Sequence, residues 1–467
     1  MGGKMKTKRL PRRNHSGVAL VISMIFVLVF SALAVSMAAV SGASVQIAEN
    51  QHNVNCARAC AESGLEIIRF WLNRVSIPGT TASSQRFGQI ASSLQNNLTA
   101  SGITNITINY DGSNIIIPAV TVDSADQRSF SVVITQIDAE TLQIAVTGVC
   151  GPLTRTVTVH YKLAASAHTV FDYGVATKGP LSLSGSVELE TVNVAVGASV
   201  YIESENSNLA LSITGNSQIA GDVSIVNPIA NVYLDGAKAG IGGQTGQPAI
   251  DNHVSFGAPA TEFPAPNPDY FEPYATDIID ATTDTTLNTT YDNVKIAAGT
   301  NPTFSGQVTF RGIVFIETPN VVTFQGSTTI TGIVVGNGDV EDNFGTNKIS
   351  FLGNVTSYDV SQLPNEDKFA AIKTQTGTCL MTPGFAVSFG GNFHTLNGVI
   401  AANGIKFYGN AGGTVNGSII NYSDSQMELT GNSDLYISAL GTANIPAGFE
   451  PEIILRYEPS TYSEVAF

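Results

Sequence analysis

The amino-acid sequence predicts an α+β N-terminal part, made of one long helix and an antiparallel sheet, followed by a mainly β region that forms a parallel β-solenoid. Three observations predict this fold. An uncharged apolar run continues into an amphipathic helix, short alternating strands follow, and a strand motif containing glycine then recurs along the chain. The expected segments are a basic leader at 1–17, a long helix at 18–75, an α+β head at 76–167 and the solenoid at 168–467.

The composition is that of a folded, acidic protein. The chain has 467 residues, which allows about three domains at roughly 150 residues each. Apolar types make up 43% of the residues and charged types only 13%, which argues against a disordered chain. The net charge of −15 argues against nucleic-acid binding, because such proteins present a basic patch to phosphate. Four cysteines are too few for a small fold held by disulfides.

The N-terminus predicts a membrane-spanning helix. Six of the 22 basic residues lie within 1–17, namely Lys4, Lys6, Lys8, Arg9, Arg12 and Arg13. Residues 18–40 are apolar and would span about 35 Å as a helix, enough for the ~30 Å hydrocarbon layer. The basic leader favours the cytoplasmic side, so the remaining chain is expected to be exported. The alternatives fit less well, because signal peptides have shorter apolar regions and helices in soluble cores have a polar face.

The helix is expected to continue beyond the membrane as an amphipathic segment over 44–75. One apolar stripe contains Val54, Ala57, Ala61, Leu65, Ile68, Leu72 and Val75. These residues recur at steps of three or four, which is the spacing of one helix face. Arg58 and Glu62 are four residues apart and can pair on a neighbouring face.

Two motifs in this helix resemble the type IV pilins, and PilX-type minor pilins in particular. Gly17 followed by the apolar run from Val18, after a basic leader, resembles a prepilin peptidase site. Residues 57–65, Ala-Arg-Ala-Cys-Ala-Glu-Ser-Gly-Leu, resemble the A-x-A-A-E-x-G-L element of PilX-type proteins, here Ala57, Ala61, Glu62, Gly64 and Leu65. The resemblance implies cleavage after Gly17, with Val18 as the mature N-terminus, and pilin or pseudopilin subunits as partners.

The sequence departs from major pilins at one position. Their mature position five is glutamate, whereas here it is Ile22. A buried terminal amine without that carboxylate is costly inside a fibre. The departure argues against a bulk pilus subunit and leaves two alternatives, a protein at a filament tip or an assembly factor held in the membrane.

Residues 76–167 are expected to form the head. A second helix over 80–100 has Phe87, Ile90, Ala91, Leu94 and Leu98 on one side. Five short alternating runs between 103 and 163, separated by turn residues, predict a small antiparallel sheet.

The C-terminal region contains a repeat of the form apolar-x-apolar-x-Gly, often followed by Asn or Ser. Copies end at Gly185, Gly215, Gly326, Gly353, Gly391, Gly409 and Gly431. The closest copies are about twenty residues apart, which is typical of one solenoid coil. Glycine allows the corner conformations, and asparagine tolerates them while forming local hydrogen bonds. A β-sandwich with glycine-rich turns is the alternative. Insertions are expected at about 236–300 and 357–384, either as binding elements or as surface padding.

Motifs for chemistry are scarce. The sequence lacks a phosphate-binding loop, a zinc-binding His-Glu-x-x-His helix and a Gly-x-Ser-x-Gly elbow, so we expect no catalytic, cofactor or metal site. An acidic patch containing Asp339, Glu341, Asp342 and Asn343 fits a solvated turn better than a Ca²⁺ site. Cys56, Cys60, Cys150 and Cys379 allow three complete disulfide pairings, and the sequence does not choose among them.

The leading hypothesis from the sequence is a non-enzymatic PilX-like minor pilin or pseudopilin. Its helix would anchor it in membrane lipid or in a filament, and its solenoid would serve assembly, adhesion or surface contact, with a surface or carbohydrate ligand as a candidate. The alternative is a membrane-anchored solenoid enzyme or binding protein acting on extracellular polysaccharide. Three or more carboxylates in one groove would favour that alternative. A third hypothesis is a single-pass scaffold that never enters a filament.

Overall fold

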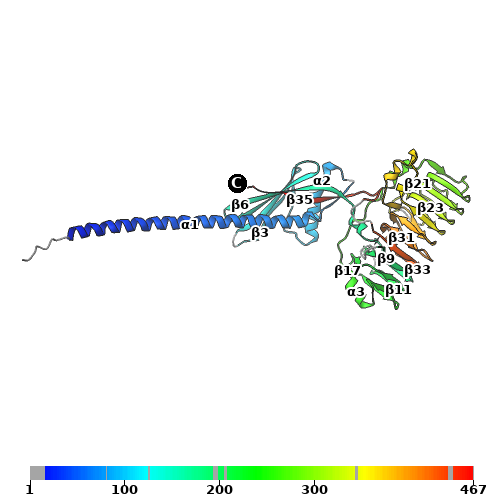
Figure 1. The fold of residues 1–467 in the computed structure, drawn as a ribbon, viewed down its shortest axis with the longest axis horizontal. Helices are drawn as coiled ribbons and strands as arrows, with labels where there is room; N and C mark the ends of the chain where they lie inside the picture. Colours follow the sequence, from blue (N-terminus) through cyan, green and yellow to red (C-terminus); the bar gives the residue numbers. More distant parts are fainter. Residues whose placement is uncertain are drawn as a thin grey trace, which may run out of the picture. The chain divides into compact units, whose positions relative to one another are not determined.

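The chain forms two compact units. The computed structural model describes residues 16–79, 81–124, 127–192, 198–204, 208–341, 345–439 and 445–465. The first unit comprises Met1–Val75, Ser83–Leu163 and Leu455–Phe467. The second unit comprises Ser76–Ala82 and Ala164–Ile454. Figure 1 colours both along the sequence. The basic leader up to residue 15 lies outside the described residues.

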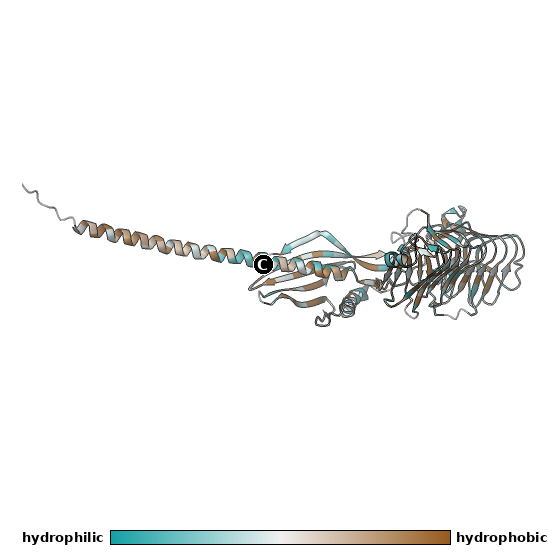
Figure 2. Ribbon diagram, turned by 90° about the horizontal axis from the view of Figure 1, so that it is seen from below, coloured by the Kyte–Doolittle hydropathy of each residue, from teal (hydrophilic) through white to brown (hydrophobic). Residues whose placement is uncertain are grey.

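One continuous helix, α1 (Ser16–Leu72), begins the first unit. At 1.5 Å per residue it is about 86 Å long. The large apolar side chains between Val18 and Ile47 are exposed, and Figure 2 shows this part of α1 as mainly hydrophobic. It is the one described helix that is long and apolar enough to cross a membrane by length and composition. Ala57, Leu65 and Leu72, in its second part, are buried.

The second part of α1 packs on a sheet. The strands follow the order β1 (Ser76–Pro78), β35 (Glu452–Val465), β6 (Leu153–Ser166), β5 (Thr141–Cys150), β4 (Arg128–Gln136), β3 (Asn114–Asp123) and β2 (Asn109–Tyr110). The pairs from β2 to β6 are antiparallel. Helix α2 (Ser83–Ala100) buries the five residues expected from its periodicity. The C-terminal strand β35 lies beside β6, whereas the sequence grouped residues 455–467 with the solenoid.

The second unit is a large, mainly β region with parallel sheets. Its twelve-stranded sheet has the order β17 (Val254–Phe256), β13 (Val223–Ile225), β10 (Val200–Ile202), β7 (Val175–Thr177), β32 (Ile419–Asn421), β29 (Val399–Ala402), β26 (Thr378–Thr382), β23 (Thr328–Gly336), β21 (Val308–Ile316), β19 (Thr289–Ile296) and β18 (Asp277–Ile279), with β25 (Val355–Tyr358) also beside β23.

Two further sheets run through the same unit. The nine-stranded sheet has the order β14 (Asn231–Asp235), β11 (Leu209–Gly215), β8 (Leu181–Gly185), β33 (Met427–Gly431), β30 (Ile405–Phe407), β27 (Ala386–Phe389), β24 (Lys348–Phe351), β22 (Val321–Phe324) and β20 (Thr303–Phe304). The third sheet has the order β16 (Gln244–Thr245), β15 (Gly240–Ile241), β12 (Gln218–Ile219), β9 (Glu188–Thr191), β34 (Asp434–Ile437), β31 (Gly413–Asn416) and β28 (Thr395–Asn397). Successive strands along the chain mostly enter these three sheets in turn, as β7, β8 and β9 do. Each such group of strands is called a coil below.

The coils are not stacked in chain order. The sheets of the second unit begin with β7, β8 and β9, which lie in the interior of the three sheets. The following strands are added on one side of them, up to β17 at one edge of the twelve-stranded sheet. It then crosses over and resumes at β18, at the opposite edge of the twelve-stranded sheet. From there it returns, until β32, β33 and β34 pair in parallel with β7, β8 and β9. The last coil therefore lies beside the first.

This path changes the interpretation of residues 236–300. The sequence predicts an insertion there, but the structure places strands β15 to β19 and helix α3 (Gln247–His253) within that range. The part between β17 and β18 is the crossover, with two short 3₁₀ helices, η3 (Pro268–Tyr270) and η4 (Glu272–Tyr274). Strands β15 to β18 were missed because two- or three-residue strands leave almost no periodicity to detect.

The apolar positions of the repeat form the core between the sheets. Five phenylalanines stack in register on successive strands of the nine-stranded sheet, with ring centroids 5.2, 4.7, 5.0 and 4.9 Å apart: Phe304, Phe324, Phe351, Phe389 and Phe407. On the adjoining coils Leu429 and Leu183 continue the same column. Each repeat therefore supplies one residue to a continuous apolar column, which is why the motif recurs.

Glycine and asparagine occupy the corners. Gly185 pairs with Gly215 on one side and with Gly431 on the other. Gly215 has a φ of 76°, and a Cβ atom there would lie 2.5 Å from the carbonyl oxygen of Gly185. At another corner, the Asn301 amide donates to Asn320 Oδ1 of the next coil at 2.8 Å. Any other residue at Gly215 would be strained and would separate adjacent coils.

Candidate functional site

The residues singled out in the N-terminal helix lie in two places. Gly17 and Val18 are at the start of α1, and the Val18 side chain is exposed. Ala57, Ala61 and Leu65 are buried in the second part of the same helix. The structure thus separates the expected processing point from the element that packs on the sheet.

Small residues allow α1 to approach the sheet closely. A Cβ atom at Gly148 of β5 would lie 3.0 Å from the Ala61 Cα atom and closer still to the backbone of Ala57. A Cβ atom at Gly64 would lie 2.6 Å from the Phe130 ring. Larger side chains at these points would therefore force the helix away. Gly148 was missed by sequence reasoning, although glycine inside a strand often marks a close backbone approach.

Glu62, the charged member of the helix element, connects α1 with the C-terminal strand. Its carboxylate accepts a hydrogen bond from Arg58 Nε at 2.9 Å, the pair expected from their spacing. It also accepts one from the Tyr462 hydroxyl at 3.3 Å. Arg58 further lies 3.6 Å from Glu464, also on β35. Nothing in the sequence pattern links residues 58 and 62 to strand β35, so these contacts were not predicted.

The cysteines are divided between the units, and all four are free thiols. Cys56, Cys60 and Cys150 lie in the first unit. Cys379 is buried in the second unit, where its Sγ lies 3.4 Å from the Ser357 hydroxyl. Burial raises the pKa of the Cys379 thiol to about 11.

In the second unit, a cover lies over the outer face of the twelve-stranded sheet. Outward-facing residues such as Tyr201, Phe315 and Met381 are buried beneath it. The crossover contributes Phe263 and Phe271. The segment between β25 and β26 contributes Val360, Leu363, Phe369 and Ile372 through η5 (Val360–Gln362), η6 (Asp367–Phe369) and η7 (Ile372–Thr374). The sequence leaves the segment 357–384 as a binding element or as surface padding, whereas the structure packs part of it against the sheet and places strand β26 within it.

An ion-pair group fixes this cover to the sheet. Arg311 Nε and Nη2 each donate to the Asp292 carboxylate at 2.6 Å, and Lys368 Nζ of the cover donates to it at 2.8 Å. These hydrogen bonds, chiefly that from Arg311, hold the pKa of Asp292 below its usual range. The carboxylate therefore stays charged and keeps both cations in place.

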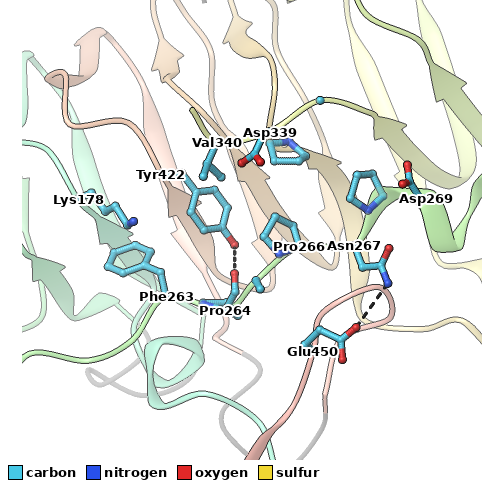
Figure 3. Close-up of a pocket in the computed structure, with 14 residues that line it drawn as sticks. Lys178, Phe263, Pro264, Pro266, Asn267, Asp269, Asp339, Val340, Tyr422 and Glu450 are labelled. Carbon is cyan, nitrogen blue, oxygen red and sulfur yellow. Dashed lines mark hydrogen bonds between the residues drawn. The ribbon is translucent and has the colours of Figure 1, made fainter. Parts of the chain in front are cut away.

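A pocket of about 810 Å³ opens between the crossover and the coils. Figure 3 shows Tyr422 donating to the Pro264 carbonyl oxygen at 2.6 Å and Asn267 donating to Glu450 at 3.4 Å. Lys178 Nζ lies 5.6 Å from the centre of the Phe263 ring. The lining thus combines aromatic rings, a cation and three carboxylates, those of Asp269, Asp339 and Glu450.

The acidic patch is only partly visible. Asp339 lines the pocket and Glu341 is exposed, whereas Asp342 and Asn343 lie outside the described residues. Within the described part of the chain, no three His, Cys, Asp or Glu residues are grouped so that they can hold a metal ion.

A comparison with protein families identifies the start of the chain. Residues 16–66 match the family model described as PilX N-terminal. This stretch, called the PilX-type segment below, is similar to the N-terminal part of PilX proteins. The resemblance to PilX-type minor pilins is thereby confirmed, and the matched range covers most of α1. The element from Ala57 to Leu65 lies within this range, and the roles of its residues stay a prediction. The PilX-type segment ends before α1 does and contains none of the second unit.

Other comparisons add little. The crystal structure of the competence-associated pilin ComZ from Thermus thermophilus is similar to this chain at 10% identity, covering 88% of this chain and 97% of that one, with a TM-score of 0.23. A TM-score this low carries no argument about the fold. No curated protein matches the sequence.

Proposed function

We propose that this chain is a non-enzymatic, PilX-like minor pilin or pseudopilin. The observation that carries the proposal is the PilX-type segment at 16–66, which coincides with a helix that is uncovered and apolar in its first part and packed on a sheet in its second. A helix of this kind holds a protein in lipid, or in a bundle of similar helices, and supports a head outside. Its partners would be other pilin subunits and the assembly machinery.

The second unit supplies the displayed part. We infer that residues 168 to about 452 form a parallel β-solenoid, because successive coils add strands to three shared sheets and one apolar column runs through them. The solenoid would be exported and would serve assembly, adhesion or surface contact. In the mature protein, Ile22 would occupy position five, which favours a filament tip or a membrane-held assembly factor over a bulk subunit.

Processing by prepilin peptidase is the first test of this proposal. Co-expression with the peptidase is expected to remove residues 1–17 and leave Val18 as the N-terminus, which intact-mass measurement detects. The Gly17→Val variant should keep the mass of the uncleaved chain, because it lacks the glycine of the expected cleavage site. Gly42→Ala is the matched control, since a Cβ atom at Gly42 meets nothing within 4 Å. An unchanged mass in the wild type would contradict cleavage after Gly17.

The pocket favours a second candidate function, an enzyme or binding protein for extracellular polysaccharide. Three carboxylates and two aromatic rings line it, and glycosidases use paired carboxylates. Figure 3 shows Asp339 and Glu450 on different segments, with Pro266 drawn between them. Release of new reducing ends from a polysaccharide by the purified chain would support an enzyme, whereas retention without release would support a binding protein.

A further inference from the structure

Three of the four cysteines gather where α1 packs on β5. Along β5 the buried residues alternate with half-buried ones, so Gly148 and Cys150 face the same side. Gly148 lies against the backbone of Ala57 and Ala61. Cys56 and Cys60 are the residues that directly precede these two alanines. The topology therefore brings thiols from α1 and from the end of β5 to one place.

Cys56 lies near both other thiols. The Cys56 thiol contributes to the pKa shifts of Cys150 and Cys60, both of which are raised chiefly by burial. It is half-buried, whereas Cys60 and Cys150 are 6% and 4% exposed. A thiol-reactive molecule therefore reaches Cys56 first. Burial raises the pKa of the Cys150 thiol, and Arg128, opposite Cys150 in the β4–β5 pairing, offsets part of that rise.

Helix geometry decides between the two partners of Cys56. Residues four apart on a helix have Cβ atoms about 5–6 Å apart, while a disulfide needs roughly 3.5–4.5 Å. A bond between Cys56 and Cys60 would therefore require α1 to unwind locally. Cys150 is on β5, a separate element, so a bond between it and Cys56 does not require α1 to unwind. Cys379 belongs to the other unit.

We propose that Cys56 and Cys150 form a disulfide that fastens α1 to β5, with Cys60 remaining a thiol. The proposal rests on the proposed function only for the oxidising compartment that export provides. The Cys56 thiolate attacks a disulfide of the oxidant and displaces one thiolate. The Cys150 thiolate then attacks the Cys56 sulfur and displaces the second. Two thiols thus lose two electrons and two protons, and the oxidant disulfide becomes two thiols.

The test uses the purified full-length chain in detergent, incubated with oxidised glutathione. Free thiols are then alkylated under denaturing conditions, and cross-linked peptides are mapped by mass spectrometry. We expect a Cys56–Cys150 cross-link in the wild type and in the matched controls Cys60→Ser and Cys379→Ser, and its loss in Cys150→Ser. Reduction should lower the unfolding temperature of the first unit by about 5 °C or more, because the disulfide restricts the unfolded chain.

Two results would overturn the proposal. One is a wild-type chain in which Cys56 and Cys150 are both fully alkylated after oxidation. The other is a Cys56–Cys60 cross-link in Cys379→Ser. Because the oxidant is added to purified protein, these results do not depend on export, and a failure of the proposed function leaves them unchanged.

Discussion

A Gly148→Val variant is expected to lower the free energy of unfolding of the first unit by about 4 kcal/mol. Valine favours β-strands more than glycine does, so the strand itself would gain stability. The new side chain, however, would occupy the space of the Ala57 and Ala61 backbone. A helix backbone cannot yield as a flexible side chain can, so α1 must separate from β5.

The measurement is a urea titration followed by tryptophan fluorescence. Trp71 is the chain's single tryptophan and lies on α1, so its signal reports the first unit. Ala145→Val is the matched control, because Ala145 lies on β5 but on the opposite face from Gly148. Equal midpoints for the two variants would contradict the close packing of α1 on the sheet.

Replacing Phe351 by alanine should lower the free energy of unfolding of the second unit by about 3–5 kcal/mol. Phe351 is 2% exposed and stacks between Phe324 and Phe389 at 4.7 and 5.0 Å. The substitution leaves a cavity in the middle of the apolar column and removes both ring contacts. Far-UV circular dichroism during urea unfolding would report the loss, while the Trp71 transition should stay in place.

Leu352→Ala provides the control for Phe351. Leu352 is the next residue along the chain, but it is 44% exposed. Its truncation should change the unfolding free energy by no more than about 0.5 kcal/mol. If both variants unfolded alike, the phenylalanine column would not be the core of this unit.

The long helix and the large parallel β region were predictable, and both rest on strong local signals. Residues 18–40 carry no charge, and the repeat places an apolar residue at Phe324, Phe351 and Phe389 in the same position before glycine. Such periodic patterns reflect which side chains face water, so they can be detected in the sequence without knowledge of the tertiary structure. The element around Glu62 was recognised by resemblance, but its contact with Tyr462 was not.

The order of the coils was not predictable from the repeat. Strand β7 pairs in parallel with both β10 and β32, and each partner presents a similar short apolar segment. Because the coils share one pattern, the period reveals that strands stack but not which ones are neighbours. The cover over the twelve-stranded sheet was missed for a related reason, since Phe263 and Phe369 stand in irregular segments without periodicity.

If α1 anchors the chain in the membrane, the second unit is exported. Protease accessibility in spheroplasts tests both points, with an antibody against residues 400–439 of the second unit as the readout. We expect protease added outside to remove the antibody signal without detergent, while a cytoplasmic marker protein stays intact. An antibody signal that resists protease until detergent opens the membrane, with the protein digested only then, would contradict it.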